Sequence, residues 1–352
     1  MPAAPSFWSH DRHFARRPAL IARARLAAAI RRHFELLGFL EVDTAALQRA
    51  PGGEAHLHAF ATRLREVDGE GVDAYLHTSP EFAMKKLLAA GESRIFSLSH
   101  VFRNRGRGAL HAPEFTMLEW YRAGAALDAV EQDCLALLRW AADAAGTTRL
   151  AYKDRDCDPF ARAERLSLRE ALQRHVGIDL YDSLPADGAP GDRDMLAAQA
   201  HALHMRVADD DSWSDIFSRI LTDRIEPSLG LGRPMVLHSY PASEAALARV
   251  SPSDARVAER FELYACGVEL ANAFDELTDA GEQRRRFEAE ADKKQKAYGE
   301  AFPVDEDFLD ALAAMPAASG AALGFDRLVM LATGAKHIDD VQWTPVFTPD
   351  AR

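Results

Sequence analysis

The chain of 352 residues has few cysteines and lacks long apolar runs. Its three cysteines, Cys134, Cys157 and Cys266, lie far apart without CxxC spacing. This argues against a disulfide framework or a structural zinc site and favours reduced thiols in the cytoplasm. No apolar run approaches the roughly 18 residues that span a bilayer, so we expect no membrane contact. Met1 to Pro18 has no apolar core of a secretory signal, which also indicates a cytoplasmic protein.

The chain also has no excess of basic over acidic residues. The formal net charge is −12, whereas a protein that mainly grips a polyanion is usually basic, so nucleic acid is disfavoured as the principal partner. The basic run 284–286 lies beside Glu282, Glu288 and Glu290 on a predicted helix, which favours a solvated, self-paired face. Neither GxGxxG nor GxxxxGK[ST] occurs, so any ATP site is built without a P-loop.

The hydrophobic patterns predict an α+β fold in which helices flank an antiparallel sheet. Residues 1–19 are expected to be irregular, and the segment of about 150–230 mostly helical. Ser79 and Pro80 are placed to open a further helix, with Ser79 as its cap. Other helices are predicted at 20–37, 127–145, 279–297 and 326–334. Strands are predicted at 39–42, 75–78, 95–103, 113–123, 235–240, 256–272 and 319–325.

The stretch 102–121, FRNRGRGALHAPEFTMLEWY, is the densest in reactive side chains. A guanidinium such as that of Arg103 can fork onto two phosphate oxygens. His111 and Phe115 could frame an aromatic base. Glu119 and Tyr121 share one strand face, where a carboxylate and a phenol could hold a substrate ammonium. The alternative is an exposed hairpin with surface charges, but such a hairpin does not need so many distinct polar types at paired spacing.

Two further stretches carry charged residues in apolar surroundings. Glu262, Glu269 and Glu276 repeat every seven residues, which on a helix would make a solvated stripe. The apolar residues between them fit two strands across a turn better, and carboxylates on a buried sheet suggest Mg²⁺ ligands. In 320–331, GAALGFDRLVML, Arg327 could reach a terminal phosphate from the start of a helix. That last pattern is weak by itself because glycine-rich strands often enter helices.

Together these stretches resemble the three signature motifs of class II aminoacyl-tRNA synthetases, and specifically the lysyl-tRNA synthetase core. YPASEAALARV at 240–250 and SGAALGFDRLVMLATGA at 319–335 are similar to a truncated paralogue family, the elongation factor P–(R)-β-lysine ligases. The resemblance implies a class II catalytic domain over 20–345, with the insertion at about 150–230, an extension at 1–19 and no anticodon-binding domain. It also implies a homodimer, although Ala45 replaces the usual proline of the dimer-forming motif.

The resemblance implies a ligase that activates (R)-β-lysine with ATP and Mg²⁺ as an aminoacyl-adenylate. The acyl group would pass to a lysine side chain of elongation factor P, forming an amide. The missing anticodon domain and the charge of −12 point away from tRNA. Two alternatives stay open. One is a stand-alone minimal lysyl-tRNA synthetase that charges tRNA with α-lysine. The other is a non-catalytic amino-acid sensor, which typically lacks the ATP-gripping arginines.

Carried over residue by residue, the resemblance implies three sets of site residues. The ATP-binding set is Arg103, Asn104, Arg105, His111, Ala112, Phe115, Glu269, Leu270, Gly324 and Arg327. The substrate-binding set is Ser79, Pro80, Glu81, Glu119, Tyr121, Asn272, Glu276 and Ala322. The metal-binding pair is Glu262 and Glu269. Arg103, on the α-phosphate, and Arg327, on the γ-phosphate, would be the catalytic residues.

Two departures bear on specificity. Arg105 stands where the family usually has glutamate, which puts a side-chain contact to the adenine amino group in question. Ala322 stands where lysyl-tRNA synthetases have glycine, as in the ligase family. One methyl group in a tight pocket is worth roughly 1–3 kcal/mol of discrimination and could favour β-lysine over α-lysine. The alternative is that Ala322 is a packing residue.

Overall fold

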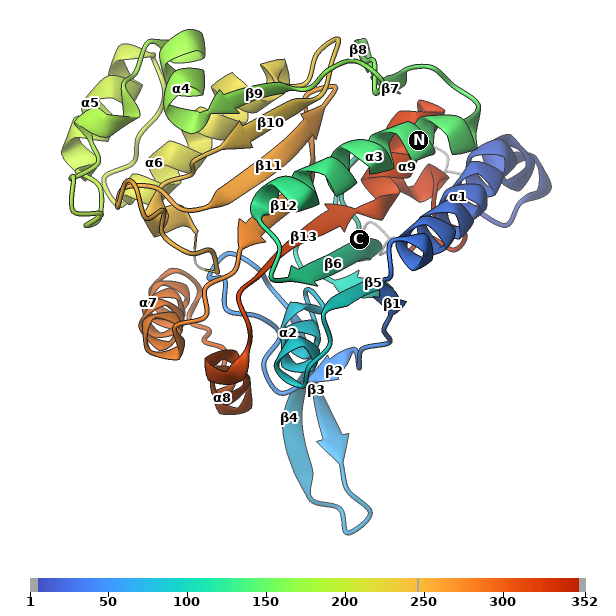
Figure 1. Cartoon of the computed structure of the whole chain (residues 1–352), viewed down its shortest axis with the longest axis horizontal. Helices are drawn as coiled ribbons and strands as arrows, with labels where there is room; N and C mark the ends of the chain where they lie inside the picture. The colour runs from blue at the N-terminus through green and yellow to red at the C-terminus, as the bar shows by residue number, and fades with distance from the viewer. Residues whose placement is uncertain (1–5, 246, 348–352) are drawn as a thin grey trace.

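The computed structural model describes residues 6–347 except residue 246, so the first five residues of the expected extension lie outside it. The α+β prediction is confirmed: helices flank an eight-stranded sheet with the order β1-β5-β6-β13-β12-β11-β10-β9 (Figure 1). Most neighbouring pairs are antiparallel, as expected, but β1 runs parallel to β5 and β10 parallel to β9. In the described residues no helix has the length and apolar character needed to cross a bilayer.

The strands of the large sheet are β1 (Leu40–Glu41), β5 (Arg94–Phe102), β6 (Glu114–Ala123), β9 (Glu164–Ser167), β10 (Met235–His238), β11 (Arg260–Ala265), β12 (Val268–Asp275) and β13 (Ala318–Gly324). Two small sheets contain β2 (Leu47–Gln48), β3 (Phe60–Arg65) and β4 (Gly71–Leu76), and β7 (Leu150–Tyr152) and β8 (Arg155–Cys157). The α-helices are α1 (His10–Leu36), α2 (Glu81–Ala89), α3 (Leu127–Ala145), α4 (Leu168–Val176), α5 (Arg193–Ala202), α6 (Trp213–Ile220), α7 (Ala280–Tyr298), α8 (Glu306–Ala314) and α9 (Phe325–Thr333).

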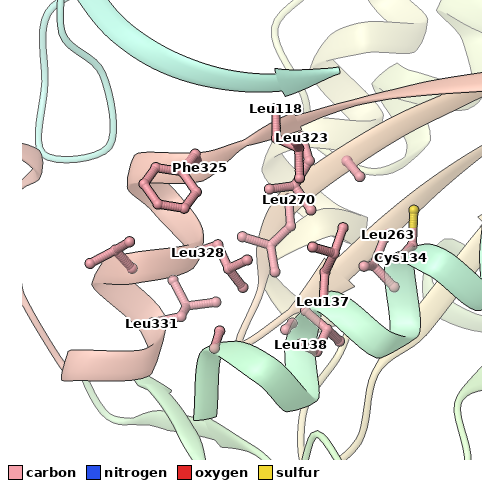
Figure 2. Packing of buried hydrophobic residues seen from close by; sticks show 14 of the residues in the cluster. Leu118, Cys134, Leu137, Leu138, Leu263, Leu270, Leu323, Phe325, Leu328 and Leu331 are labelled. Atoms are coloured by element: carbon pink, nitrogen blue, oxygen red, sulfur yellow. The ribbon is translucent and has the colours of Figure 1, made fainter. Parts of the chain in front are cut away.

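One face of the sheet is apolar and is covered by α1, α3 and α9 (Figure 1). Leu118 of β6, Leu270 of β12 and Leu323 of β13 meet Leu137 of α3 and Leu328 of α9 in a continuous core (Figure 2). Successive residues of a strand point to opposite faces, so alternate positions of the same strands reach the other side.

The opposite face carries polar side chains and is covered in part by α2, α7 and α8. Phe82 of α2 packs on Phe308 of α8, with 4.1 Å between ring centroids, and both join a second core with Phe287 of α7. Tyr121 of β6 belongs to this second core, whereas its neighbour Trp120 belongs to the first. The alternation of β6 therefore separates packing residues from residues available to a site.

The first helix is longer than predicted. α1 begins at His10 and continues through Pro18, whereas residues up to 19 were expected to be irregular. Proline removes one backbone hydrogen bond inside a helix. Pro18 and Phe14, whose carbonyl loses that bond, are both exposed, so water can satisfy it. The buried Arg16 donates to the Gln342 carbonyl and so docks the first turns onto the C-terminal segment. The end at Gly38, with φ of +77°, is as predicted.

The segment 150–230 is only partly helical. Its first residues form β7, β8 and β9, and the mostly helical prediction is wrong there. β9 adds to the large sheet by pairing in parallel with β10, a partner about seventy residues further along the sequence. The helices α4 to α6 then enclose a separate apolar cluster that includes Trp213 and Phe217. The helix α8 and the projecting strand β3 were not predicted.

A buried ion pair ties α1 to α9. Asp326 is 1% exposed and binds the Arg23 guanidinium, and it also accepts from the Thr116 backbone N–H at 3.1 Å and the Gln342 side chain at 3.0 Å. Removing one partner of a buried ion pair leaves an uncompensated charge. We expect Asp326→Ala to lower the free energy of unfolding by about 3–5 kcal/mol, measured by urea denaturation.

The matched control is Glu41→Ala, which removes a surface ion pair with Arg31 whose side chains are 47% and 40% exposed. Exposed pairs contribute about 1 kcal/mol or less. Equal losses from the two substitutions would show that Asp326 does not tie α1 to α9.

Candidate active site

A cavity of about 540 Å³ opens on the polar face of the sheet. Most of the predicted site residues line it, although they come from segments far apart in the sequence. These residues are Ser79, Glu81, Arg103, Asn104, Arg105, His111, Ala112, Phe115, Glu262, Glu269, Leu270, Asn272, Ala322, Gly324 and Arg327. The remaining four, Pro80, Glu119, Tyr121 and Glu276, do not line it.

Two arginines, Arg103 and Arg327, line the cavity. Arg103 follows β5, donates from Nε to the Thr78 carbonyl at 3.2 Å and lies 5.4 Å from the Phe115 ring centroid. Arg327 begins α9 and donates to the Glu269 carbonyl at 2.9 Å. Burial lowers the pKa of Arg103, and the Arg327 charge lowers it further in spite of Glu54. Two guanidiniums that repel each other across a cavity favour an anion between them.

His111 is held neutral beside these arginines. Burial lowers its pKa to about 4, and the charges of Arg327 and Arg103 add to that effect. Arg327 Nη2 lies 2.7 Å from His111 Nε2, so the neutral ring accepts that hydrogen bond. His111 therefore orients Arg327 at neutral pH and does not compete with it for protons.

The Arg105 side chain pairs with a carboxylate outside the loop, at the position where the resembled family usually has glutamate. Its Nη2 lies 2.6 Å from Glu300 Oε1, after α7, and its backbone φ is +60°. The Asn104 side chain accepts from the Arg105 N–H at 2.9 Å. The residue that departs from the family therefore joins the loop between β5 and β6 to the segment after α7, through an ion pair whose side chains are 52% and 43% exposed.

Glu262 belongs to a hydrogen-bond network whose other members were not predicted from the sequence. Its Oε2 accepts from Tyr240 at 2.5 Å and Tyr264 at 2.6 Å, and its Oε1 from Arg260 at 2.6 Å. Arg260 and Tyr264 lie two residues before and after Glu262, so period-2 alternation could have found them. A carboxylate offers about four acceptor positions, which leaves one on Oε1.

Glu269 can contribute to the same cation site. Burial raises its pKa, and the neighbouring Glu262 charge raises it further. Its carboxylate has only a long contact with Arg327, at 3.5 Å. Two repelling carboxylates with acceptor positions left fit a divalent cation that also binds phosphate oxygens. Among the described residues no group of three or more His, Cys, Asp or Glu is arranged to hold a metal ion.

A buried charged cluster lies beneath the substrate end of the cavity. Glu119 Oε1 accepts from Tyr121 at 2.5 Å, and Oε2 accepts from Ser79 at 2.7 Å. Lys85, 1% exposed, lies 2.5 Å from Glu81 Oε1 and 2.6 Å from Glu276 Oε2. Lys85 was not singled out from the sequence, although it follows Glu81 by one helical turn. Ser79 and Glu81 join this cluster to the cavity.

One ammonium faces three carboxylates in this cluster, so the carboxylates cannot all be charged. Burial raises the pKa of Glu119 to about 7 and that of Glu276 to about 8, with the Glu81 charge adding to both. Burial alone would lower the pKa of Lys85, but Glu276 and Glu81 outweigh it and raise it, so Lys85 stays charged. Glu276 Oε1 has no hydrogen-bond partner among the described residues. The cluster is short of positive charge, and an added ammonium would supply it.

Two other sequence-based expectations, on Ser79 and on the basic run 284–286, concern neighbouring residues. Ser79 Oγ accepts the Glu81 N–H at 3.1 Å, as expected of a cap, but α2 begins at Glu81 and Pro80 precedes it. Asp275 pairs with Arg249 at 2.6 Å and is not part of the cluster. The prediction that the basic run is self-paired holds in part: Arg285 binds Glu282 of the same helix, whereas Arg284 binds Glu306 of α8.

Comparison with known proteins gives consistent results. The family described as tRNA synthetases class II (D, K and N) matches residues 8–348. A protein named elongation factor P–(R)-β-lysine ligase from Salmonella dublin is 42% identical over 328 residues, which is 92% of this chain and 94% of that protein. Proteins of the same name from Salmonella heidelberg strain SL476 and Salmonella typhimurium strain LT2 show the same identity and coverage.

The charge shortage beneath the cavity predicts a pH-dependent stability. A carboxylate whose pKa is raised on folding from 4.5 stabilises the fold fully below that value, and the contribution is lost as the pH rises through the raised value. We expect the free energy of unfolding to fall from about pH 4.5 to about pH 8 and to level off above that. Glu119→Gln should flatten this slope by up to about 1.4 kcal/mol per pH unit.

Urea denaturation at a series of pH values measures the slope. Glu66→Gln, in the exposed turn between β3 and β4, is the isosteric control and should keep the wild-type slope. If Glu119→Gln and wild type have the same slope, Glu119 is ionised throughout and the cluster is not short of positive charge.

Proposed function

This chain belongs to the class II tRNA synthetase family of the D, K and N type, and from that membership we propose that it is an ATP-dependent ligase acting on elongation factor P. It activates (R)-β-lysine as an aminoacyl-adenylate and transfers the acyl group to a lysine side chain of that factor, forming an amide. One observation carries the proposal: a single cavity contains two sites of opposite charge preference. Arg103 and Arg327 form an anion site in it, and Ser79 and Glu81 connect it to the buried carboxylate cluster, which attracts an ammonium.

The two ends of the cavity suit the two substrates, ATP at one end and the amino acid at the other. Arg103 binds the α-phosphate of ATP, where the substrate carboxylate attacks and charge develops. Arg327, oriented by His111, holds the γ-phosphate and directs the leaving pyrophosphate. The His111 and Phe115 side chains frame the adenine. Arg103 lies over the Phe115 ring, so Phe115 also orients the guanidinium. Asn104, Arg105, Ala112, Leu270 and Gly324 complete the ATP site.

The amino-acid substrate is held at the other end by carboxylates, which attract its positively charged ammonium. Glu119 and Glu276, aided by Tyr121, attract the side-chain ammonium, while Ser79, Glu81 and Asn272 contact the rest of the molecule. Ser79 must release Glu119 for a direct contact, because its hydroxyl holds one of the carboxylate oxygens. Pro80 places Ser79 and Glu81 at the start of α2.

Glu262 and Glu269 are the proposed ligands for Mg²⁺, each with an acceptor position left. When bound, the metal would supply positive charge that lowers the cost of the negative charge developing on the phosphates. Until then Arg260, Tyr240 and Tyr264 hold the Glu262 carboxylate in place.

We propose that the ligase acts in the cytoplasm as a homodimer, with 20–345 as its catalytic domain. Support for pairing comes from large apolar side chains left exposed just before α1, along α1 and on β1, where class II cores associate. These are Trp8, Phe14, Leu36 and Leu40, with exposures of 73%, 66%, 84% and 54%.

The proposal is tested by offering both acceptors to the pure protein. The protein is incubated with ATP, Mg²⁺ and (R)-β-lysine, together with elongation factor P or tRNA. We expect a mass gain of one β-lysyl unit on the factor and no charged tRNA. Arg103→Ala should reduce both this product and pyrophosphate exchange by about 10²-fold or more, because it removes a charge that binds the α-phosphate.

Charged tRNA with an unmodified factor would instead establish a minimal lysyl-tRNA synthetase. Neither product, together with no pyrophosphate exchange, would favour an amino-acid sensor. Wild-type levels of exchange by Arg103→Ala would remove Arg103 from the α-phosphate site.

Ala322 is proposed to set the preference for the β-amino acid. It lines the cavity and pairs in register with Glu119 of β6 and Asn272 of β12. Ala322→Gly removes one methyl group and should raise kcat/KM for α-lysine relative to (R)-β-lysine by about 10–200-fold. The control is Ala321→Gly, which changes the buried neighbour on the opposite, apolar face. An unchanged ratio in Ala322→Gly would assign Ala322 to packing.

A further inference from the structure

One carboxylate in the cavity has no function in the steps described above. The carboxylates lining the cavity are those of Glu54, Glu81, Glu262, Glu269 and Asp326. Lys85 pairs with Glu81, three donors hold Glu262, Arg327 contacts Glu269, and Arg23 binds Asp326. Within residues 6–347, residue 246 aside, no hydrogen bond or ion pair involves the Glu54 carboxylate, so of these five carboxylates it alone has no protein partner.

The backbone around Glu54 is held firmly although its side chain is not. The next residue, Ala55, donates from its N–H to Glu290 of α7 at 2.8 Å and accepts from Lys294 of α7 at 2.9 Å. On the other side, a Cβ on Gly53 would lie 2.3 Å from the Phe287 ring, so the chain approaches α7 more closely than an alanine could. This anchoring fixes the point from which the Glu54 side chain enters the cavity.

Glu54 lies beside the arginine that binds the α-phosphate. Of the charges that act on Arg103, that of Glu54 has the largest effect, yet no ion pair joins them in the described residues. Four charged groups face Glu54: Arg103 after β5, Arg260 of β11, Glu81 of α2 and Glu290 of α7. The carbonyl carbon of an aminoacyl-adenylate is one oxygen away from the α-phosphate, so Glu54 stands near the carbon that an acceptor attacks.

The histidines of the cavity are poorly suited to accept a proton there. His111 accepts a hydrogen bond from Arg327 through Nε2 and has a lowered pKa. His56 is bound to the Tyr298 hydroxyl at 2.9 Å, and His58 lies 3.5 Å from Glu300. Burial raises the pKa of Glu54, with Arg103 opposing the shift, so its carboxylate is a stronger base than an exposed one.

We propose that Glu54 is the general base of the transfer half-reaction, accepting a proton from the acceptor amine as that amine attacks the aminoacyl-adenylate. This inference rests on the proposed function, because it needs an amine as the acceptor. It assigns Glu54 to the second half-reaction only, since the substrate carboxylate that attacks ATP carries no proton to remove.

The step balances as follows. The acceptor ammonium first loses one proton to solvent, and the neutral nitrogen attacks the carbonyl carbon of the adenylate. The C–N bond forms, and the C–O bond to the phosphate breaks. AMP leaves with the electron pair of that bond. The second proton of the nitrogen passes to a Glu54 oxygen and is then released to solvent.

The test separates the two half-reactions in Glu54→Gln, which keeps the shape of the side chain and removes its basicity. Pyrophosphate exchange with (R)-β-lysine should stay within about 2-fold of wild type. Single-turnover transfer to elongation factor P, read by intact mass, should slow by about 10²–10⁴-fold. Below the raised pKa of Glu54, wild-type transfer should fall more steeply with decreasing pH than transfer by Glu54→Gln, which keeps only the pH dependence of amine deprotonation.

Two further readouts distinguish a base from a structural residue. Hydroxylamine is a much weaker base than a lysine amine, so the nitrogen of its adduct loses its proton to water without a protein base. Glu54→Gln should therefore form the hydroxamate from bound adenylate at the wild-type rate. In Glu54→Ala, added formate should restore part of the transfer rate. Glu92→Gln, at an exposed position after α2, is the matched control and should behave as wild type in every assay.

Each alternative outcome overturns the inference in a recognisable way. Transfer by Glu54→Gln within about 3-fold of wild type would exclude a base role. Equal losses in exchange, hydroxamate formation and transfer would show that Glu54 binds substrate or positions Arg103. If wild-type protein completes exchange but never modifies the factor, the proposed acceptor is wrong and the inference about Glu54 fails with it.

Discussion

The structure depends on the alternation of side chains in the central strands of the large sheet, which β12 interrupts once, at a bulge where Leu270 and Ala271 both belong to the apolar core. Leu118, Leu270 and Leu323 pack under α3 and α9, while Glu119 and Ala322 lie on the opposite face. A shift of one residue in any of these strands would bury charges in the apolar core and remove the site. The packing of one face therefore fixes which residues are present on the other.

On the polar face of the sheet, positive charges are in excess at one end of the cavity and carboxylates are in excess at the other. Between Arg103 and Arg327 the guanidiniums repel each other and attract phosphate. Beneath Ser79 the carboxylates outnumber Lys85, so the cluster attracts an ammonium. Between these ends Glu262 and Glu269 lie close enough to raise the pKa of Glu269. ATP, a divalent cation and an amino acid with a side-chain amine would each relieve one of these imbalances.

Local patterns in the sequence predicted most of the regular elements. The helix over 127–145 coincides with α3, and the hairpin of 95–103 and 113–123 with β5 and β6 to within one residue at each end. Predictions failed where a distant contact overrides local preference. α1 passes through Pro18 because Arg16 docks on the C-terminal segment, and β9 forms a strand because β10 lies beside it.

By itself the sequence determined the strand alternation, the positions of the two arginines and the spacing of the acidic residues, since these depend on periodicity and on residue type. Its resemblance to a family supplied their expected roles. Only the tertiary structure decided which charges are paired. Lys85 pairs with Glu276, which follows β12 nearly two hundred residues later, and Arg105 pairs with Glu300. Among the described residues Glu54 has no hydrogen-bond or ion-pair partner. Such pairings depend on distance and burial in space, which neither spacing nor composition of the chain encodes locally.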